Sequence, residues 1–152
     1  MADELFTVRD GRADDKLVLD AFCMAEGMDA LPSIERVRVA VNEDDEVVGF
    51  IRIAVDEDEG TAFVNPVITH DTWRGFGVGR ALMDEALSHY GELRLVSRGG
   101  SLAFYEALGY ERISWELIKM ALVDDCDNCE IRDECGPVPM RKRADAASEQ
   151  AG

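Results

Sequence analysis

The chain has 152 residues, 47% of them hydrophobic, and a formal net charge of -16 at pH 7 from 32 acidic and 16 basic side chains. This length indicates a single domain, and the apolar content indicates that it is folded and excludes a disordered chain. The acidic excess excludes nucleic acids and anionic membranes as main partners, since both need a basic surface. No apolar run approaches the ~20 residues of a membrane helix, and acidic residues among the first ten argue against a signal peptide, so we expect a cytoplasmic protein.

The basic residues are strongly skewed towards arginine. Only Lys16, Lys119 and Lys142 are lysines. A dispersed acidic excess with little lysine favours a halophilic protein, because concentrated salt screens the self-repulsion. An acidic groove for a cationic substrate is the alternative, and the spread of acids along the chain makes it the weaker one.

Hydrophobic periodicity predicts alternating strands and helices. The patterns predict strands at 5–8, 36–41, 47–55, 61–69 and 93–96, helices at 14–28, 76–90 and 100–108, and a closing strand or hairpin at 110–123. The acidic runs at 43–46 and 56–59 are predicted to be solvated turns. Pro66 lies inside a strand run and cannot donate to a ladder, so Asn65-Pro66 marks either a bulge or an ordinary edge strand.

The most informative segment is Arg74-Gly75-Phe76-Gly77-Val78-Gly79-Arg80, between a predicted strand and the best predicted helix. Alternating glycines can adopt conformations that other residues avoid and can direct several N–H groups at one point. A helix beginning there adds unpaired donors and a positive dipole end, which together suit a phosphate or pyrophosphate. Arg74 and Arg80 add cationic charge. A P-loop is excluded because no Lys-Ser/Thr follows, and the dinucleotide fingerprint fails on its third glycine.

The Arg-x-x-Gly-x-Gly pattern of this segment resembles the acyl-CoA pyrophosphate loop of the GNAT N-acetyltransferase superfamily. Two further segments strengthen the resemblance. Val67-Ile68-Thr69 is similar to the strand whose backbone pairs with the pantetheine arm in that family, and 101–110 is similar to its second signature, with Tyr105 at the position that often protonates the leaving CoA thiolate. Where many members carry an Asn before this helix, the chain has Arg98-Gly99-Gly100, so backbone groups or Ser101 are expected to contact the cofactor.

The resemblance implies a mixed, mostly antiparallel sheet flanked by helices, with the bulged strand splayed from its neighbour to admit the acyl group. It also implies transfer of an acetyl group from acetyl-CoA to a primary amine by direct attack. A backbone N–H near Thr69 would stabilise the oxyanion, and His70 or a water chain would serve as base. The alternative is a non-catalytic acyl-CoA-binding module. The acceptor is expected to be a small molecule or a peptide, contacted chiefly by 21–33, and dimers are frequent in the family.

The GNAT resemblance covers roughly residues 4 to 122, which predicts an acetyltransferase domain at 1–123, and the composition changes after it. Residues 124–152 form an acidic tail, with an end expected to be flexible, that contains Cys126, Cys129 and Cys135 in Cys-x2-Cys-x5-Cys spacing. Two thiolates two residues apart bind one metal ion readily, so a structural zinc site completed by Cys23, a histidine or a carboxylate is one interpretation. Free thiols in a mobile tail are the other, and the resemblance does not decide between them. Such a tail could also dock a partner. Covalent catalysis by Cys23 has no base partner in the sequence.

Overall fold

The computed structural model describes residues 6–56, 59–97, 101–118 and 137–144. The chain divides into two compact units. The first unit comprises residues 1–54 and 64–86, and the second comprises residues 55–63 and 87–152.

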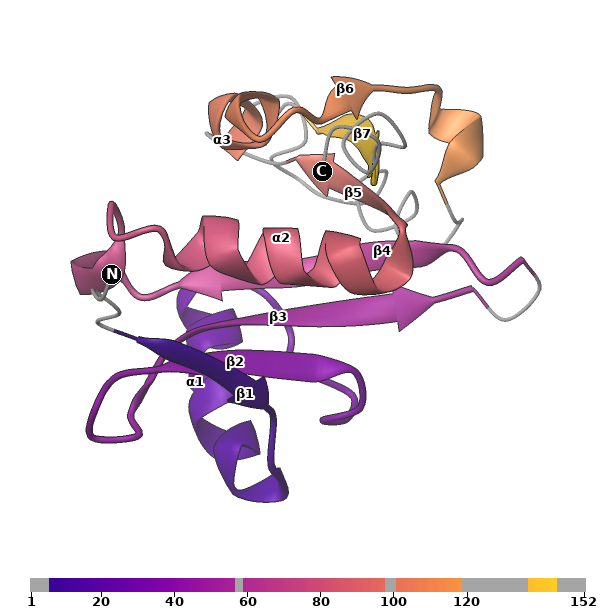
Figure 1. The fold of residues 1–152 in the computed structure, drawn as a ribbon. Helices are drawn as coiled ribbons and strands as arrows, with labels where there is room; N and C mark the ends of the chain where they lie inside the picture. The colour runs from indigo at the N-terminus through magenta and orange to yellow at the C-terminus, as the bar shows by residue number, and fades with distance from the viewer. Residues whose placement is uncertain (1–5, 57–58, 98–100, 119–136, 145–152) are drawn as a thin grey trace. The chain divides into compact units, whose positions relative to one another are not determined.

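The sheet of the first unit is built from strands β1 to β4 (Figure 1). β1 pairs antiparallel with β2, with Thr7 opposite Val41, and β2 pairs antiparallel with β3, with Val39 opposite Phe50. β4 follows β3, and just past its end the His70 N–H donates to the Val48 carbonyl over 2.8 Å. The bounds of the strands are Thr7–Asp10, Val37–Val41, Val47–Val55 and Ala62–Thr69.

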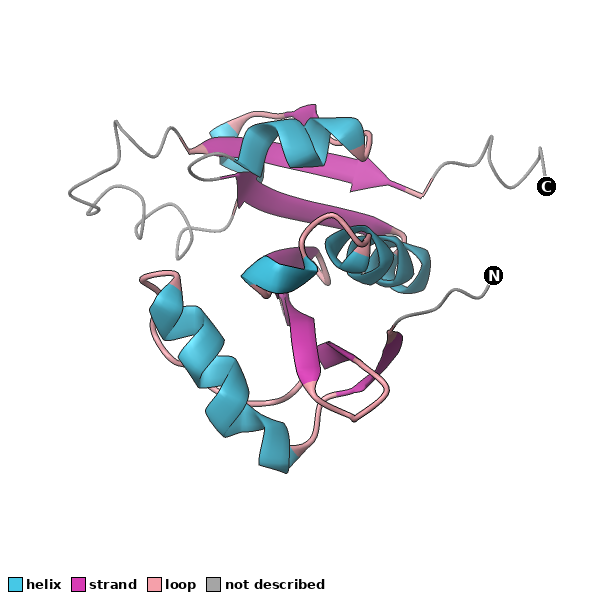
Figure 2. Ribbon diagram, turned by 90° about the vertical axis from the view of Figure 1, so that its left-hand side faces the viewer, coloured by secondary structure: helices cyan, strands magenta, loops and turns pink. Residues whose placement is uncertain are grey.

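One face of this sheet is covered by α1, Lys16–Ala25, which follows the short 3-10 helix η1, Ala13–Asp15 (Figure 2). Alternation along β2, and along β3 beyond the irregularity at Ala40 and Val41, places every second apolar side chain on this face. The resulting core consists of Leu19, Cys23, Leu31, Val37, Val39, Val41, Phe50 and Ile68. The predicted helix at 14–28 is therefore present, in a shorter form.

The opposite face is covered by the first turns of α2, Val78–Tyr90. Gly49 lies on this face, and a Cβ added to it would be 2.8 Å from Cγ1 of Val78. Further along the helix, both carboxylate oxygens of Glu85 accept from the Arg38 guanidinium of β2, at 2.7 and 2.8 Å. These two contacts fix the axis of α2 over β2 and β3.

The second unit contains β5, Glu92–Ser97, β6, Glu111–Arg112, and β7, Val138–Arg143. β7 runs antiparallel to β5, with Met140 opposite Leu95, and antiparallel to β6, with Met140 opposite Arg112. The start of β4 pairs parallel with β5, with Phe63 opposite Arg94. The helices are α3, Leu102–Ala107, and the 3-10 helix η4, Trp115–Leu117.

The predicted fold class is confirmed: helices flank a mixed sheet in which β4 and β5 form a parallel pair, while the β1–β2, β2–β3, β5–β7 and β6–β7 pairs are antiparallel. The closing element differs from its prediction. Of residues 110–118, which the structure describes, only the two residues of β6 form a strand, and their long partner β7 lies further on, within 124–152. None of the helices in the described part of the chain is long and apolar enough to cross a membrane.

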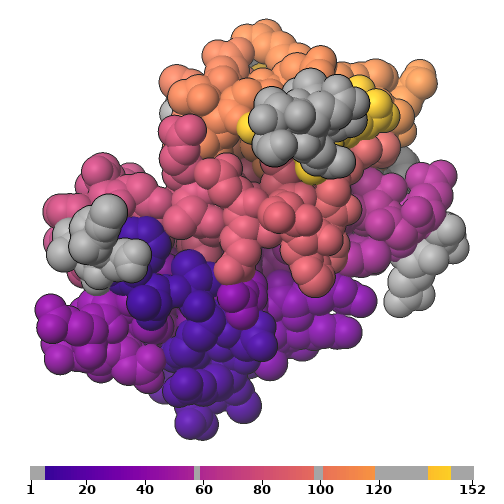
Figure 3. Space-filling view, viewed as in Figure 1, coloured from indigo at the N-terminus to yellow at the C-terminus, as the bar shows by residue number. Residues whose placement is uncertain are grey.

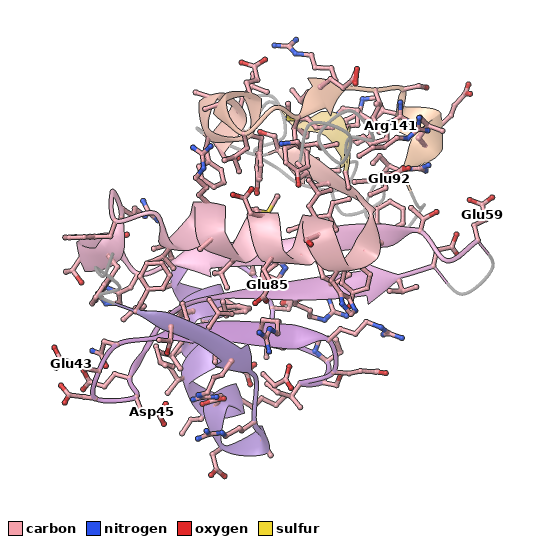
Figure 4. The ribbon with its side chains drawn as sticks, viewed as in Figure 1. Glu43, Asp45, Glu59, Glu85, Glu92 and Arg141 are labelled. Atoms are coloured by element: carbon pink, nitrogen blue, oxygen red, sulfur yellow. The ribbon has the colours of Figure 1, made fainter. Side chains whose placement is uncertain are left out.

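The predicted acidic turns behave differently from each other. Glu43 and Asp45 lie in an exposed turn that protrudes from the first unit, in purple in Figure 3 and labelled in Figure 4. In the second turn Glu59 is exposed, but Asp56 is buried, with its backbone N–H bonded to the Thr61 carbonyl at 2.9 Å. The interpretation of 56–59 as wholly solvated is therefore wrong at Asp56.

Candidate active site

The connection from β4 to α2 turns twice through left-handed backbone. After Thr69 comes the 3-10 helix η2, Asp71–Trp73, and then Gly75 with φ +91° and Gly77 with φ +83°. A Cβ added at either glycine would meet nothing within 4 Å. The requirement for glycine therefore comes from the backbone dihedral and not from crowding.

The first backbone amides of α2 have no acceptor inside the helix. The first helical bond runs from the Ala81 N–H to the Gly77 carbonyl at 2.9 Å, so the N–H groups of Gly77, Val78, Gly79 and Arg80 precede it. Together with the positive end of the helix dipole they form a seat for an anion. Gly79 lies in the helix and, unlike Gly75 and Gly77, does not have a positive φ.

Two arginines flank this anion seat. Arg74 lies 3.2 Å from Asp71 and 3.6 Å from Glu26, and Arg80 lies 3.8 Å from Asp84. Both guanidinium groups are largely exposed. Exposed ion pairs contribute at most about 1 kcal/mol, so a phosphate can exchange with these carboxylates at little cost.

Aromatic rings line the same loop. The Phe76 side chain is 53% exposed, and its ring centroid is 5.4 Å from that of Trp73. Trp73 in turn makes an edge contact with Phe6 at 6.4 Å. The Val78 side chain is buried, so this residue can offer a ligand only its backbone N–H.

The end of β4 presents backbone groups on the side away from β3. Since the His70 N–H is bonded to β3, strand alternation directs the amides of Thr69 and Val67 the other way. Ile68 lies in the α1 core through its side chain. Val67 and Thr69 therefore have the orientation that pairing with an amide-containing arm requires.

A family model described as an acetyltransferase (GNAT) domain matches residues 33–112, a span of 80 of the 152 residues. The span includes β2 to β6, the glycine loop and α2. The chain belongs to the GNAT acetyltransferase family. The resemblance seen in the two signatures is thereby confirmed, and no curated protein sequence matches the chain.

Solved GNAT structures have the same fold. N-acetylglutamate synthase from Neisseria gonorrhoeae, solved with coenzyme A and N-acetyl-glutamate, has a TM-score of 0.75 at 10% identity, over 94% of this chain and 36% of the synthase chain. Nourseothricin acetyltransferase has a TM-score of 0.69 at 18% identity, over 93% and 100%. Naa50 from Arabidopsis thaliana, solved with the bisubstrate analogue CoA-Ac-MVNAL, has a TM-score of 0.64 at 17% identity, over 91% and 99%.

His70 caps the turn that begins the GNAT loop. Its Nδ1 accepts the Thr72 N–H at 3.2 Å and lies 2.9 Å from the Thr72 hydroxyl, while its ring packs 6.0 Å from that of Phe22. A neutral imidazole that accepts at Nδ1 carries its proton on Nε2 and has no second acceptor to offer. The base role of His70 stays a prediction, and this capping bond opposes it.

Tyr105 and Ser101 belong to the second unit. Tyr105 lies on α3, is 8% exposed, and packs edge-on against Phe104 and Tyr110 at 5.1 and 5.9 Å. The Ser101 hydroxyl lies 3.2 Å from that of Ser97. These contacts all lie within the second unit and do not test whether either residue contacts CoA. The roles of Tyr105 and Ser101 towards CoA therefore stay predictions.

The cysteines divide between the core and the undescribed tail. Cys23 is buried in the α1 core, where burial raises the pKa of its thiol, which disfavours a nucleophilic thiolate. Cys126, Cys129 and Cys135 lie outside the described residues. Within the described ranges, no group of three or more histidine, cysteine, aspartate or glutamate side chains could hold a metal ion.

The sequence analysis missed Arg52. It is the only charged residue in the nine residues of β3, and its Nη1 donates to the Asn65 carbonyl of β4 at 2.9 Å. A lone charge within an otherwise apolar strand run was the available signal.

Proposed function

We propose that the protein is an N-acetyltransferase that transfers the acetyl group of acetyl-CoA to a primary amine by direct attack. The observation that carries the proposal is the loop of two left-handed glycines leading into unpaired amides of α2, flanked by Arg74 and Arg80. Because the chain belongs to the GNAT family, we interpret this loop as the CoA-binding loop of an acyltransferase.

In this proposal the loop holds the diphosphate of CoA. The oxygens of the diphosphate accept from the amides of Gly77, Val78, Gly79 and Arg80. The Arg74 guanidinium gives up its ion pairs with Asp71 and Glu26 and pairs with a phosphate group instead. The outward-facing backbone of Val67 and Thr69 pairs with the amides of the pantetheine arm. Acetyl-CoA supplies an activated thioester. The protein contributes mainly by holding the amine against it, an effect worth several kcal/mol.

The remaining groups are proposed to stabilise the developing oxyanion and to transfer protons. The Thr69 N–H stabilises negative charge that develops on the thioester oxygen, because it is not used by β3. Tyr105 donates its phenolic proton to the departing thiolate, as a phenol of pKa ~10 can do for a thiol of pKa ~8.5. A water chain takes the proton of the substrate ammonium, with His70 as the alternative that mutation must test.

The acceptor is proposed to be a small-molecule or peptide amine. In support, the gonococcal synthase was solved with an acetylated amino acid and Naa50 with a peptide conjugate of CoA. A homodimer and a cytoplasmic location are part of the same hypothesis. A non-catalytic acyl-CoA-binding module would share the loop but would release no thiol.

The test is an assay of thiol release from acetyl-CoA across amine classes, run at low and high salt. We expect release with at least one class, and we expect Tyr105→Phe to lower kcat while the Kd for CoA stays the same. His70→Ala should reduce kcat much less. Binding of CoA without release on any amine would favour the non-catalytic module instead.

A further inference from the structure

Arg52 is a half-buried cation of β3. Within the described ranges, no aspartate or glutamate lies at ion-pair distance from its guanidinium, although the chain has 32 acidic residues. Other arginines of the first unit are paired: Arg9 with Asp15 at 2.8 Å and Arg38 with Glu85 at 2.7 Å are examples. Among the described residues, its hydrogen bond to the Asn65 carbonyl uses one of its five N–H donors.

The charged neighbour that acts most strongly on Arg52 is another cation, Arg36. Arg52 is opposite Val37 in the β2–β3 ladder, which places it on the α1 face, and the Ile53 N–H donates to the Arg36 carbonyl at 3.0 Å. Burial lowers the pKa of Arg52, and the positive charge of Arg36 lowers it further, while Cys23 and Glu35 act weakly in the other direction. Glu35 is itself 3.6 Å from Arg36.

A half-buried guanidinium without a counterion carries a desolvation cost that a bound anion would offset. The planar fork of arginine matches a carboxylate, to which it can donate two parallel bonds. The side chain lies on the face covered by α1, next to the segment 21–33 that the sequence analysis assigned to the acceptor. We propose that Arg52 binds a carboxylate of the acceptor substrate. This inference rests on the proposed acetyltransferase function and narrows its substrate class.

The point at which the Arg52 side chain contacts β4 also limits the shape of the acceptor. Its contact, Asn65, precedes Thr69 by four residues, which is about 13 Å of extended strand. Thr69 is where the proposed function places the thioester. The reacting amine and the bound carboxylate are therefore separated by roughly 10 Å. Amino acids that carry both groups on one carbon are too short, whereas a peptide with an acidic side chain near its N-terminus and an ω-amino acid have the required span.

The experiment compares matched acceptors in the thiol-release assay. One pair is Ala-Ala-Glu-Ala-amide against Ala-Ala-Gln-Ala-amide, and the other is 8-aminooctanoate against 8-aminooctanamide. We expect the wild-type protein to prefer the carboxylate of at least one pair by about 10- to 100-fold in kcat/KM, as for hydrogen bonds to a charged group. A preference in the first pair alone would identify a peptide acceptor, and in the second pair alone a small molecule.

Arg52→Gln should abolish this preference without changing the Kd for CoA, and Arg52→Lys should keep part of it, because the charge remains without the fork. Arg12→Gln, which removes an exposed arginine of the same unit, should leave the preference unchanged. Calorimetry of the same pairs on CoA-saturated protein provides a readout that does not depend on turnover.

Thiol release without a carboxylate preference in either pair, or a preference that survives in a folded Arg52→Gln protein, would overturn the inference and leave the acetyltransferase proposal intact. If neither carboxylate binds CoA-saturated protein more tightly than its amide, the inference is also wrong. Absence of CoA binding would instead refute the proposed function.

Discussion

Val78 packs directly on Gly49. A Cβ added at Gly49 would lie 2.8 Å from Cγ1 of Val78 and 3.0 Å from the Ile68 carbonyl oxygen, so only glycine fits between α2, β3 and β4. Val78 is the first residue of α2, and its N–H is one of the four amides of the anion seat. The contact therefore determines how the GNAT loop approaches the sheet.

Gly49→Ala should destabilise the protein by about 1–3 kcal/mol, the usual cost of overpacking a core. Because the backbone of β4 is one of the two near neighbours, the strain cannot be relieved by a side-chain rotation alone. We also expect weaker CoA binding. Urea unfolding and calorimetry measure the two effects, and adding Val78→Ala should recover part of the stability. Unchanged stability and affinity would show that the contact does not position the loop.

Gly77→Ala tests the loop against a matched position. Gly77 and Gly91 have nearly the same dihedral, φ +83° and +84°, and an added Cβ meets nothing within 4 Å at either. Both alanine variants should lose about 1–2 kcal/mol of stability from left-handed backbone. Only Gly77→Ala should weaken CoA binding, by about tenfold or more, since it moves the donors of the anion seat. Equal CoA affinity in the two variants would show that the glycine loop does not bind CoA.

Asp71 competes with phosphate for Arg74, at 3.2 Å. Asp71→Asn should tighten CoA binding by up to about fivefold, because an exposed ion pair of at most about 1 kcal/mol no longer has to be broken. Arg74→Gln should weaken binding by about tenfold and reduce its dependence on salt concentration. Titrations at two potassium chloride concentrations measure both. An Asp71→Asn protein that binds CoA less tightly would contradict the proposed exchange.

The Arg9–Asp15 pair makes the stability pH-dependent. Arg9 donates to both Asp15 oxygens at 2.8 and 3.1 Å, and the Arg12 N–H donates at 2.7 Å. The Arg9 hydrogen bonds, with help from Arg12 and against the effect of burial, lower the pKa of Asp15 below its ordinary 3.8. The carboxylate therefore stabilises the fold above the ordinary pKa, and this contribution is lost as the pH falls through the lower, folded pKa.

Asp15→Asn should accordingly cost about 1.5–3 kcal/mol at pH 7, as expected for hydrogen bonds to a charged group. The difference from wild type should shrink as the pH falls below about 4. Unfolding curves at several pH values provide the measurement. A stability difference that stays constant down to the acid transition would exclude Asp15 as its source.

The fold was predictable where periodicity is local. β2, β3 and α2 lie within two residues of their predicted bounds, because their apolar residues alternate or recur every turn. β7 was missed because Pro139 and the cations that follow it look like a polar tail, and what makes it a strand is pairing with the distant β5. The patterns that predict β2, β3 and α2 are local in the sequence, whereas β7 depends on pairing with a distant strand.

Some features of the candidate site could likewise be predicted from the sequence, and others could not. Gly75 and Gly77 could be recognised because their left-handed backbone demands a residue type that the sequence displays. The helical conformation of Gly79 and the capping bond of His70 depend on where η2 ends and α2 begins, which periodicity does not locate to one residue. The lack of a carboxylate near Arg52 is a property of the packed fold, so no sequence pattern could have revealed it.

The most direct test of the account is calorimetric titration of the folded protein with CoA and acetyl-CoA, in dilute and in molar potassium chloride. The account predicts saturable binding of both, with 1:1 stoichiometry, that is lost or strongly weakened in Gly77→Ala and preserved in Gly91→Ala. No detectable heat with either ligand in either salt, from a protein whose thermal unfolding is cooperative, would contradict it.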